Sequence, residues 1–174
     1  MKNVSFRMHL AACTAIGAVV AALPLANAGV MVPANATYVK ECGACHMPYS
    51  PQLLPAASWK KITSHLDDHF GDSAKLDAST QSSVTDYLVA NSADRANSSE
   101  ARAIMQSVNG GAAPERITQV PYIRDLHAAV LDPTWNGHPR PKTLTECGVC
   151  HRNVSQGNFT SKTFSVSDEA FRGR

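Results

Sequence analysis

Thiol and imidazole side chains gather at two places in this chain, in almost the same pattern. Residues 42–46 read Cys-Gly-Ala-Cys-His, and residues 147–151 read Cys-Gly-Val-Cys-His. These motifs contain all of the 5 cysteines except Cys13, which lies near the N-terminus. Side chains at positions i and i+3 share one face of a helical turn. Each cysteine pair can therefore hold one group, with a histidine placed directly after it.

Three kinds of site use closely spaced cysteines, and the histidines separate them. Disulfides suit an exported chain, and paired Cys-x-x-Cys knuckles can hold zinc, usually about 15 to 20 residues apart. Here 101 residues lie between Cys45 and Cys147, and neither kind of site explains a histidine after each pair. Cys-x-x-Cys-His is the attachment signature of c-type haem. Two thiols bond the two vinyl groups, and the histidine lies under the iron.

We therefore expect two covalently attached c-type haems. The cofactor-binding residues predicted for them are Cys42, Cys45, His46, Cys147, Cys150 and His151.

The N-terminus has the pattern of an export signal. Lys2 and Arg7 precede an apolar stretch from Leu10 to Leu25, which ends in Ala26-Asn27-Ala28. A basic start, an apolar run and a small-x-small site are typical of a cleaved signal peptide. We expect residues 1–28 to be removed, which also removes Cys13, and the remaining protein to lie in the periplasm.

Charge and composition point away from several partners. Without residues 1–28 the chain has 14 basic and 14 acidic residues, so it is formally neutral. A neutral surface gives no reason to expect binding to nucleic acid or to an anionic membrane. The predicted partners are redox proteins, and no small-molecule substrate is expected.

The second axial ligand decides whether a haem carries electrons, binds gases or does chemistry. Methionine and histidine are the usual candidates. Met47 adjoins a proximal ligand and cannot reach the opposite side, and Met31 is close to the new terminus. Met105 lies among apolar residues in a helical pattern, which favours a place in the core. Histidine is therefore the better candidate.

Without residues 1–28 and the two motif histidines, four histidines remain as candidate second ligands: His65, His69, His127 and His138. His69 lies 23 residues after His46, and His127 lies 24 residues before His151. Each iron can thus find a second imidazole in its own half of the chain. We expect the pairs His46–His69 and His151–His127, with a crossed arrangement left open. His138 lies in a Pro- and Gly-rich turn and could bind an iron or lie beside a haem propionate.

Residues 58–70 have the pattern of one helix. Ser58 is the expected N-cap, and Gly71 follows the end. Apolar and aromatic side chains recur on one face at helical spacing, and His69 belongs to this face together with Trp59, Ile62, Leu66 and Phe70. His65 lies nearer to its edge.

Helical patterns dominate the rest, at about 35–45, 79–91, 99–108, 119–131 and 143–151, without a convincing alternating strand. We predict an all-α fold. The predicted divisions are residues 1–28 as signal, 29–96 as N-terminal haem domain and 97–174 as C-terminal haem domain.

The sequence resembles the small exported dihaem cytochromes c, the DHC-type family. The resemblance rests on ECGACHMPYSPQLLPAASW, LDDHFGDSAKLD, VTDYLVANSADRA, RITQVPYIRDLHAAV and CGVCH. It implies two haems with two axial histidines each, with His69 and His127 as the distal ligands. It also implies a class I-like N-terminal half and a less regular C-terminal half.

For function, the resemblance implies electron delivery between a membrane b-type cytochrome and small soluble haem proteins, including an oxygen-binding monohaem cytochrome c. We expect a low-potential electron carrier rather than an enzyme. The alternative is a haem enzyme or small-ligand binder, of peroxidase or reductase type, with one open axial position.

Overall fold

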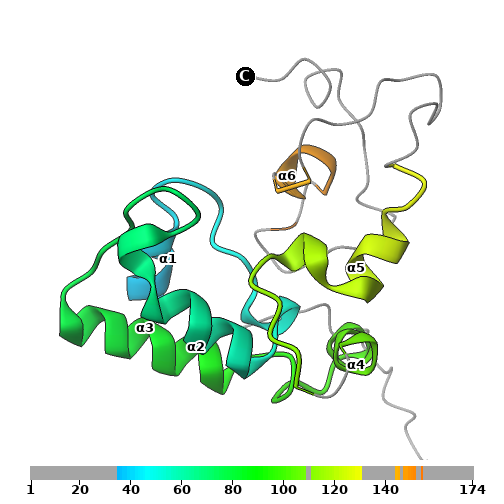
Figure 1. Cartoon of the computed structure of the whole chain (residues 1–174), viewed down its shortest axis with the longest axis horizontal. Coiled ribbons are helices and arrows are strands. Elements are labelled where there is room, and N and C mark those ends of the chain that lie inside the picture. Colours follow the sequence, from blue (N-terminus) through cyan, green and yellow to red (C-terminus); the bar gives the residue numbers. More distant parts are fainter. Residues whose placement is uncertain (1–34, 109–110, 131–143, 146, 152–153, 155–174) are drawn as a thin grey trace, which may run out of the picture.

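The computed structural model describes residues 35–108, 111–130, 144–145, 147–151 and 154. Within these ranges the chain forms helices joined by turns, with no β-strand, which confirms the predicted all-α class (Figure 1). The elements are α1 (Ala36–Cys42), η1 (Pro51–Leu53), α2 (Ala56–Ser64), η2 (Leu66–Asp68), α3 (Ala78–Ala90), α4 (Ser99–Ser107), η3 (Ile117–Gln119), α5 (Pro121–Leu126) and α6 (Cys147–Cys150).

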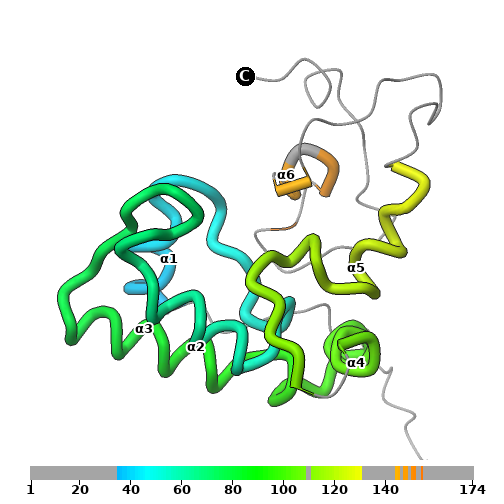
Figure 2. Tube along the Cα trace, viewed as in Figure 1, coloured from blue at the N-terminus to red at the C-terminus, as the bar shows by residue number. Residues whose placement is uncertain are grey.

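The helices pack as two groups that share a core. Helices α1 and α2 contact α3, while α4 contacts α5 and η1 (Figure 2). The buried cluster contains Tyr38, Leu53, Leu54, Trp59, Ile62, Val84, Leu88, Ala93, Ala101, Ile104, Val108 and Val120. This core crosses residue 97, and the division into two domains at that position stays a prediction.

Helix α1 leads directly into the first motif. The Asn35 side chain caps it by accepting the Tyr38 N–H at 2.9 Å. The helix ends at Cys42, since Gly43 is its C-cap, so it is shorter than the predicted 35–45. Tyr38 is buried, whereas its neighbour Val39 is 46% exposed.

The prediction of one helix over 58–70 is wrong. Helix α2 begins at Ala56 after Pro55, and Ser58 is a buried residue inside it rather than the N-cap. It ends at Ser64, because His65 takes a non-helical conformation with φ −127° and ψ 41°. The Thr63 and Ser64 hydroxyls donate to carbonyls of the preceding turn, and such local bonds compete with continued helix.

Helix α5 is also shorter than the predicted 119–131. It begins with Pro121 at its first position, where the missing N–H costs nothing. It ends at Leu126, and His127 is its C-cap. Leu126, the last residue of the helix, is 63% exposed.

Some predictions concern residues outside the described ranges. These are the signal over 1–28, the terminal Met31 and the candidate ligand His138. Among the residues that the structure describes, no helix has the length and apolar character needed to cross a membrane.

Candidate haem-binding sites

The first motif spans the end of α1 and the turn after it. Cys42 is the last residue of the helix and is half-buried, while Cys45 is exposed in the following turn. His46 Nδ1 lies 2.8 Å from the Met47 carbonyl oxygen. Since a carbonyl only accepts, Nδ1 carries the hydrogen, and Nε2 is left to bind a metal.

His69 lies opposite His46. Their ring centroids are 6.3 Å apart, and the ring planes meet at 23°. Because a transition metal binds an imidazole nitrogen at about 2 Å, two imidazoles on opposite sides of one metal have centroids roughly 6 Å apart. The separation therefore suits a shared iron. The structure brings together the pair that the sequence predicts.

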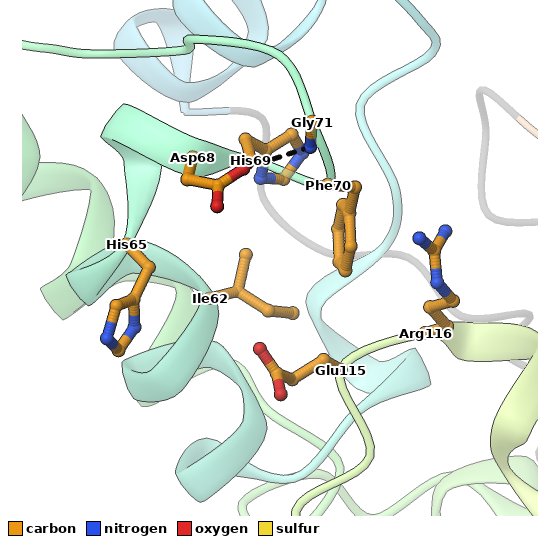
Figure 3. Close-up of a pocket in the computed structure, with 8 residues that line it drawn as sticks. All are labelled: Ile62, His65, Asp68, His69, Phe70, Gly71, Glu115 and Arg116. Atoms are coloured by element: carbon orange, nitrogen blue, oxygen red, sulfur yellow. Dashed lines mark hydrogen bonds between the residues drawn. The ribbon is translucent and has the colours of Figure 1, made fainter.

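A turn, rather than a helix face, places His69. It follows η2, and its N–H donates to the Asp72 carbonyl at 2.6 Å. Phe70 has a φ of 60°, the left-handed region, and Gly71 has 103°. The Asp68 carboxylate accepts the Gly71 N–H at 3.1 Å (Figure 3). His69 faces His46 as the sequence predicts, but a turn brings it there and the predicted helical stripe does not.

His69 lines a pocket of about 300 Å³ together with residues of the turn and of the segment before η3 (Figure 3). Arg116 lies over the Phe70 ring, with its guanidinium carbon 4.2 Å from the ring centroid, a cation–π contact. Next to it, Glu115 pairs with Lys61 at 2.5 Å. The segment before η3 is thus held against the turn that positions His69. Sequence reasoning missed Arg116, because no local pattern marks it.

The second motif forms the short helix α6. The His151 N–H donates to the Cys147 carbonyl at 2.8 Å, which places His151 directly after the helix. His127 faces it from the end of α5, with ring centroids 6.0 Å apart and planes at 76°. His127 Nδ1 donates to the Ile123 carbonyl at 2.7 Å, which leaves Nε2 available. This pair also has a separation that suits one iron.

Burial favours the neutral form of two of these imidazoles. It lowers the pKa of His69, with further contributions from His46 and Arg116 that the Asp72 carboxylate opposes. It also lowers the pKa of His151, and His127 adds to the effect. A metal binds the neutral imidazole. The surroundings therefore favour the form of the side chain that a ligand needs.

The other candidates lie elsewhere. His65 is exposed, and its Nδ1 lies 3.0 Å from the Ser64 hydroxyl and 3.1 Å from the Lys61 carbonyl. No ring contact in the described part of the chain pairs His65 with another histidine. Met105 packs, partly buried, against the apolar core, as predicted.

The four motif cysteines fit the thioether bonds that c-type haem forms. All four are unpaired thiols, and the described residues contain no group of three or more His, Cys, Asp or Glu that could hold a metal ion. Burial, with help from Glu41, raises the pKa of Cys42 to about 11, and burial also raises the pKa of Cys147 and of Cys150. The four thiols, each pair followed by a histidine, therefore fit c-type haem.

Comparison with known proteins agrees with this chemistry. A family model for dihaem cytochrome c, DHC, matches residues 38–159. A dihaem cytochrome c structure from Rhodobacter sphaeroides is 32% identical, with a TM-score of 0.64, and the match covers 74% of this chain and 99% of that one. One from Shewanella baltica OS155 is 30% identical, with a TM-score of 0.59, covering 78% and 94%.

No curated protein matches the chain. The family model nevertheless covers both attachment motifs and both facing imidazoles. The chain therefore belongs to the dihaem cytochrome c family, electron-transfer proteins that carry two covalently bound c-type haems.

Proposed function

We propose that this protein is a periplasmic electron carrier in which both haems are low-potential and bis-histidine ligated. The observation that carries the proposal is the facing of imidazoles at both motifs, at 6.3 Å and 6.0 Å between centroids. The assigned ligand pairs are His46 with His69 and His151 with His127. When bound, each haem iron takes up and releases one electron.

The chain's own residues hold these ligands in fixed orientations. The Met47 carbonyl accepts from His46, and the Ile123 carbonyl accepts from His127. Such partners fix the ring orientation and raise the basicity of the metal-binding nitrogen. Ligands that need not move when the iron changes charge suit electron transfer, and two occupied axial positions leave no site for a substrate.

The ligand type supports a low potential. Methionine together with histidine raises the potential of a c-type haem. Both second ligands proposed here are imidazoles. We therefore place both potentials below those of Met/His cytochromes c.

The proposed compartment rests on the sequence pattern, and the proposed partners rest on the family resemblance. The pattern over residues 1–28 supports export, and covalent attachment would keep the haems bound outside the cytoplasm. The proposed electron donor is a membrane b-type cytochrome, and the proposed acceptor is a soluble haem protein. Both come from the family resemblance.

Spectra of the purified ferric protein test the ligation. We expect electron paramagnetic resonance (EPR) to detect low-spin iron only, and carbon monoxide to leave the spectrum of the reduced protein unchanged. A stoichiometric high-spin signal, or carbon monoxide binding, would instead support a haem enzyme or small-ligand binder with an open position.

The localisation has its own test. Protein recovered from the periplasmic fraction should begin at Gly29, and its mass should exceed that of residues 29–174 by two haems. Protein that retains residues 1–28 would contradict the cleavage proposed here.

A further inference from the structure

We propose that Tyr49 is a positioning residue that joins the two haem-binding sites. Its ring packs on His46, and its hydroxyl bonds to the backbone that leads into the second motif. The inference rests on the ligand assignment proposed above. It adds a role for a residue that belongs to neither motif.

Both contacts of Tyr49 are direct. Its ring stacks on the His46 ring, with centroids 4.8 Å apart and planes at 28°. Its hydroxyl donates to the Thr145 carbonyl at 2.7 Å. Thr145 lies two residues before Cys147 and 96 residues away from Tyr49 along the chain. One side chain thus contacts the proximal ligand of one site and the approach to the other.

The core holds the backbone of Tyr49. Tyr38, which is 5% exposed in α1, donates its hydroxyl to the Tyr49 carbonyl at 2.7 Å. The Tyr38 ring packs against Tyr87 of α3, with centroids 5.3 Å apart. Burial raises the pKa of Tyr38 well above its usual range, so the hydroxyl keeps its proton and remains a donor. The backbone from which the Tyr49 side chain extends is therefore held in place by the core.

The second motif needs such an anchor. Helix α6 has four residues, and helices this short have little stability of their own, because so few backbone bonds offset the cost of starting the helix. Contacts with the rest of the protein must hold it. Since electron exchange falls steeply with the separation of two redox centres, a contact that fixes one site relative to the other bears on function.

Tyr49→Phe tests the link between the sites in the haem-loaded protein. This change keeps the ring that stacks on His46 and removes only the hydroxyl bond to Thr145. A typical hydrogen bond contributes enough for about a fivefold change in an opening equilibrium. We therefore expect hydrogen exchange of the His151 amide, which bonds to Cys147, to become about fivefold faster. Pulsed EPR should also detect a broader distribution of distances between the two ferric irons.

Thr85→Val is the matched control. It removes a hydroxyl bond of the same length, from Thr85 to the Gln81 carbonyl at 2.7 Å, which lies wholly within α3. We expect exchange at His151 to stay unchanged in this variant. Equal rates at His151 in Tyr49→Phe and the parent protein, or an equal rise in Thr85→Val, would overturn the inference.

Comparing Tyr49→Leu with Tyr49→Phe distinguishes the ring contact with His46 from the hydroxyl bond to Thr145. It removes both contacts, so the low-spin EPR signal of the first iron should shift in addition to the faster exchange at His151. Tyr49→Phe should restore the parent signal, which a general loss of stability would not do. High-spin iron in the unmodified protein would refute the ligand assignment, whereas the exchange rates at His151 report on Tyr49 alone.

Discussion

The two haem-binding sites share a motif, but the helices that carry the motif differ in length and in packing. The first follows the seven-residue, capped helix α1, which packs on α3 and the core. The second is the four-residue helix α6. The facing rings meet at 23° in the first site and at 76° in the second. Five nearly identical residues thus set the attachment chemistry, while the segment that brings the second imidazole sets the orientation of the rings.

The largest expected effect is the change of iron spin state on replacing His69 or His127, the proposed second ligands of the two sites. His69→Ala and His127→Ala should each leave both haems attached by mass, and each should convert one iron per molecule to high spin. The two variants should lose different low-spin signals. Nearly parallel rings donate into the same iron d orbital, whereas nearly perpendicular rings donate into different ones. EPR of the ferric proteins measures both outcomes.

His65→Ala is the control for these variants. His65 is exposed, and it lies four residues from His69 without facing another imidazole in the described structure. Both low-spin signals should survive its replacement. Loss of the first signal in this variant would mean that His65, rather than His69, is the ligand.

The next largest effect should come from replacing the glycines of the two motifs, which should differ in their tolerance of a side chain. A Cβ at Gly43 would clash with the backbone carbonyl of Val39, whereas one at Gly148 would lie 3.7 Å from Val154 Cγ1, an ordinary contact. Gly43→Ala should therefore lower the free energy of unfolding by about 1–3 kcal/mol. Gly148→Ala should be neutral or stabilising, because alanine favours a helix over glycine. Denaturant unfolding of the loaded proteins measures both, and equal losses would remove this contrast.

The N-cap of α1 should have a smaller effect, confined to the first site. Asn35→Ala removes the acceptor for the Tyr38 N–H and should cost about 1 kcal/mol. Amide exchange in α1 should speed up, while exchange at His151 should not. Asn35→Asp, which keeps an acceptor, should restore the parent rates. Faster exchange at both sites would indicate that α1 also supports α6.

The smallest expected effect is the loss of stability that follows protonation of Asp77 in acid. Asp77 caps α3, the helix that packs against α1. Hydrogen bonds from Ser79 and Thr80 lower the pKa of Asp77, the N-cap of α3. The carboxylate therefore stabilises the fold above its unfolded pKa of about 3.9. This stabilisation is lost as the pH falls through the lowered folded value. Asp77→Asn, which keeps a good cap, should give a shallower loss of thermal stability on acidification, and parallel curves would contradict this assignment.

Local sequence was a good guide to the chemistry and a poor guide to the helix ends. The motifs identified the cysteines, and the spacing, the apolar pattern around His69 and the family resemblance together indicated the imidazole pairs that face one another in the structure. The continuation of α2 to Phe70 was wrong, because hydroxyl bonds from Thr63 and Ser64 and the conformation of His65 end the helix earlier. The contacts of Arg116 and Tyr49 could not be predicted, since they join segments far apart in the chain and leave no periodic signal.

The left-handed turn at Phe70 makes the first site dependent on distant residues. Left-handed backbone costs a residue with a side chain about 1–2 kcal/mol and persists where the surroundings enforce it. Arg116, which covers the Phe70 ring, comes from beyond α4. A truncated chain ending before Glu115 would keep Cys42, Cys45 and His46. It would lose Arg116, which packs on the Phe70 ring next to His69. We therefore expect that the first haem site cannot be excised from the rest of the chain without loss of the His69 position.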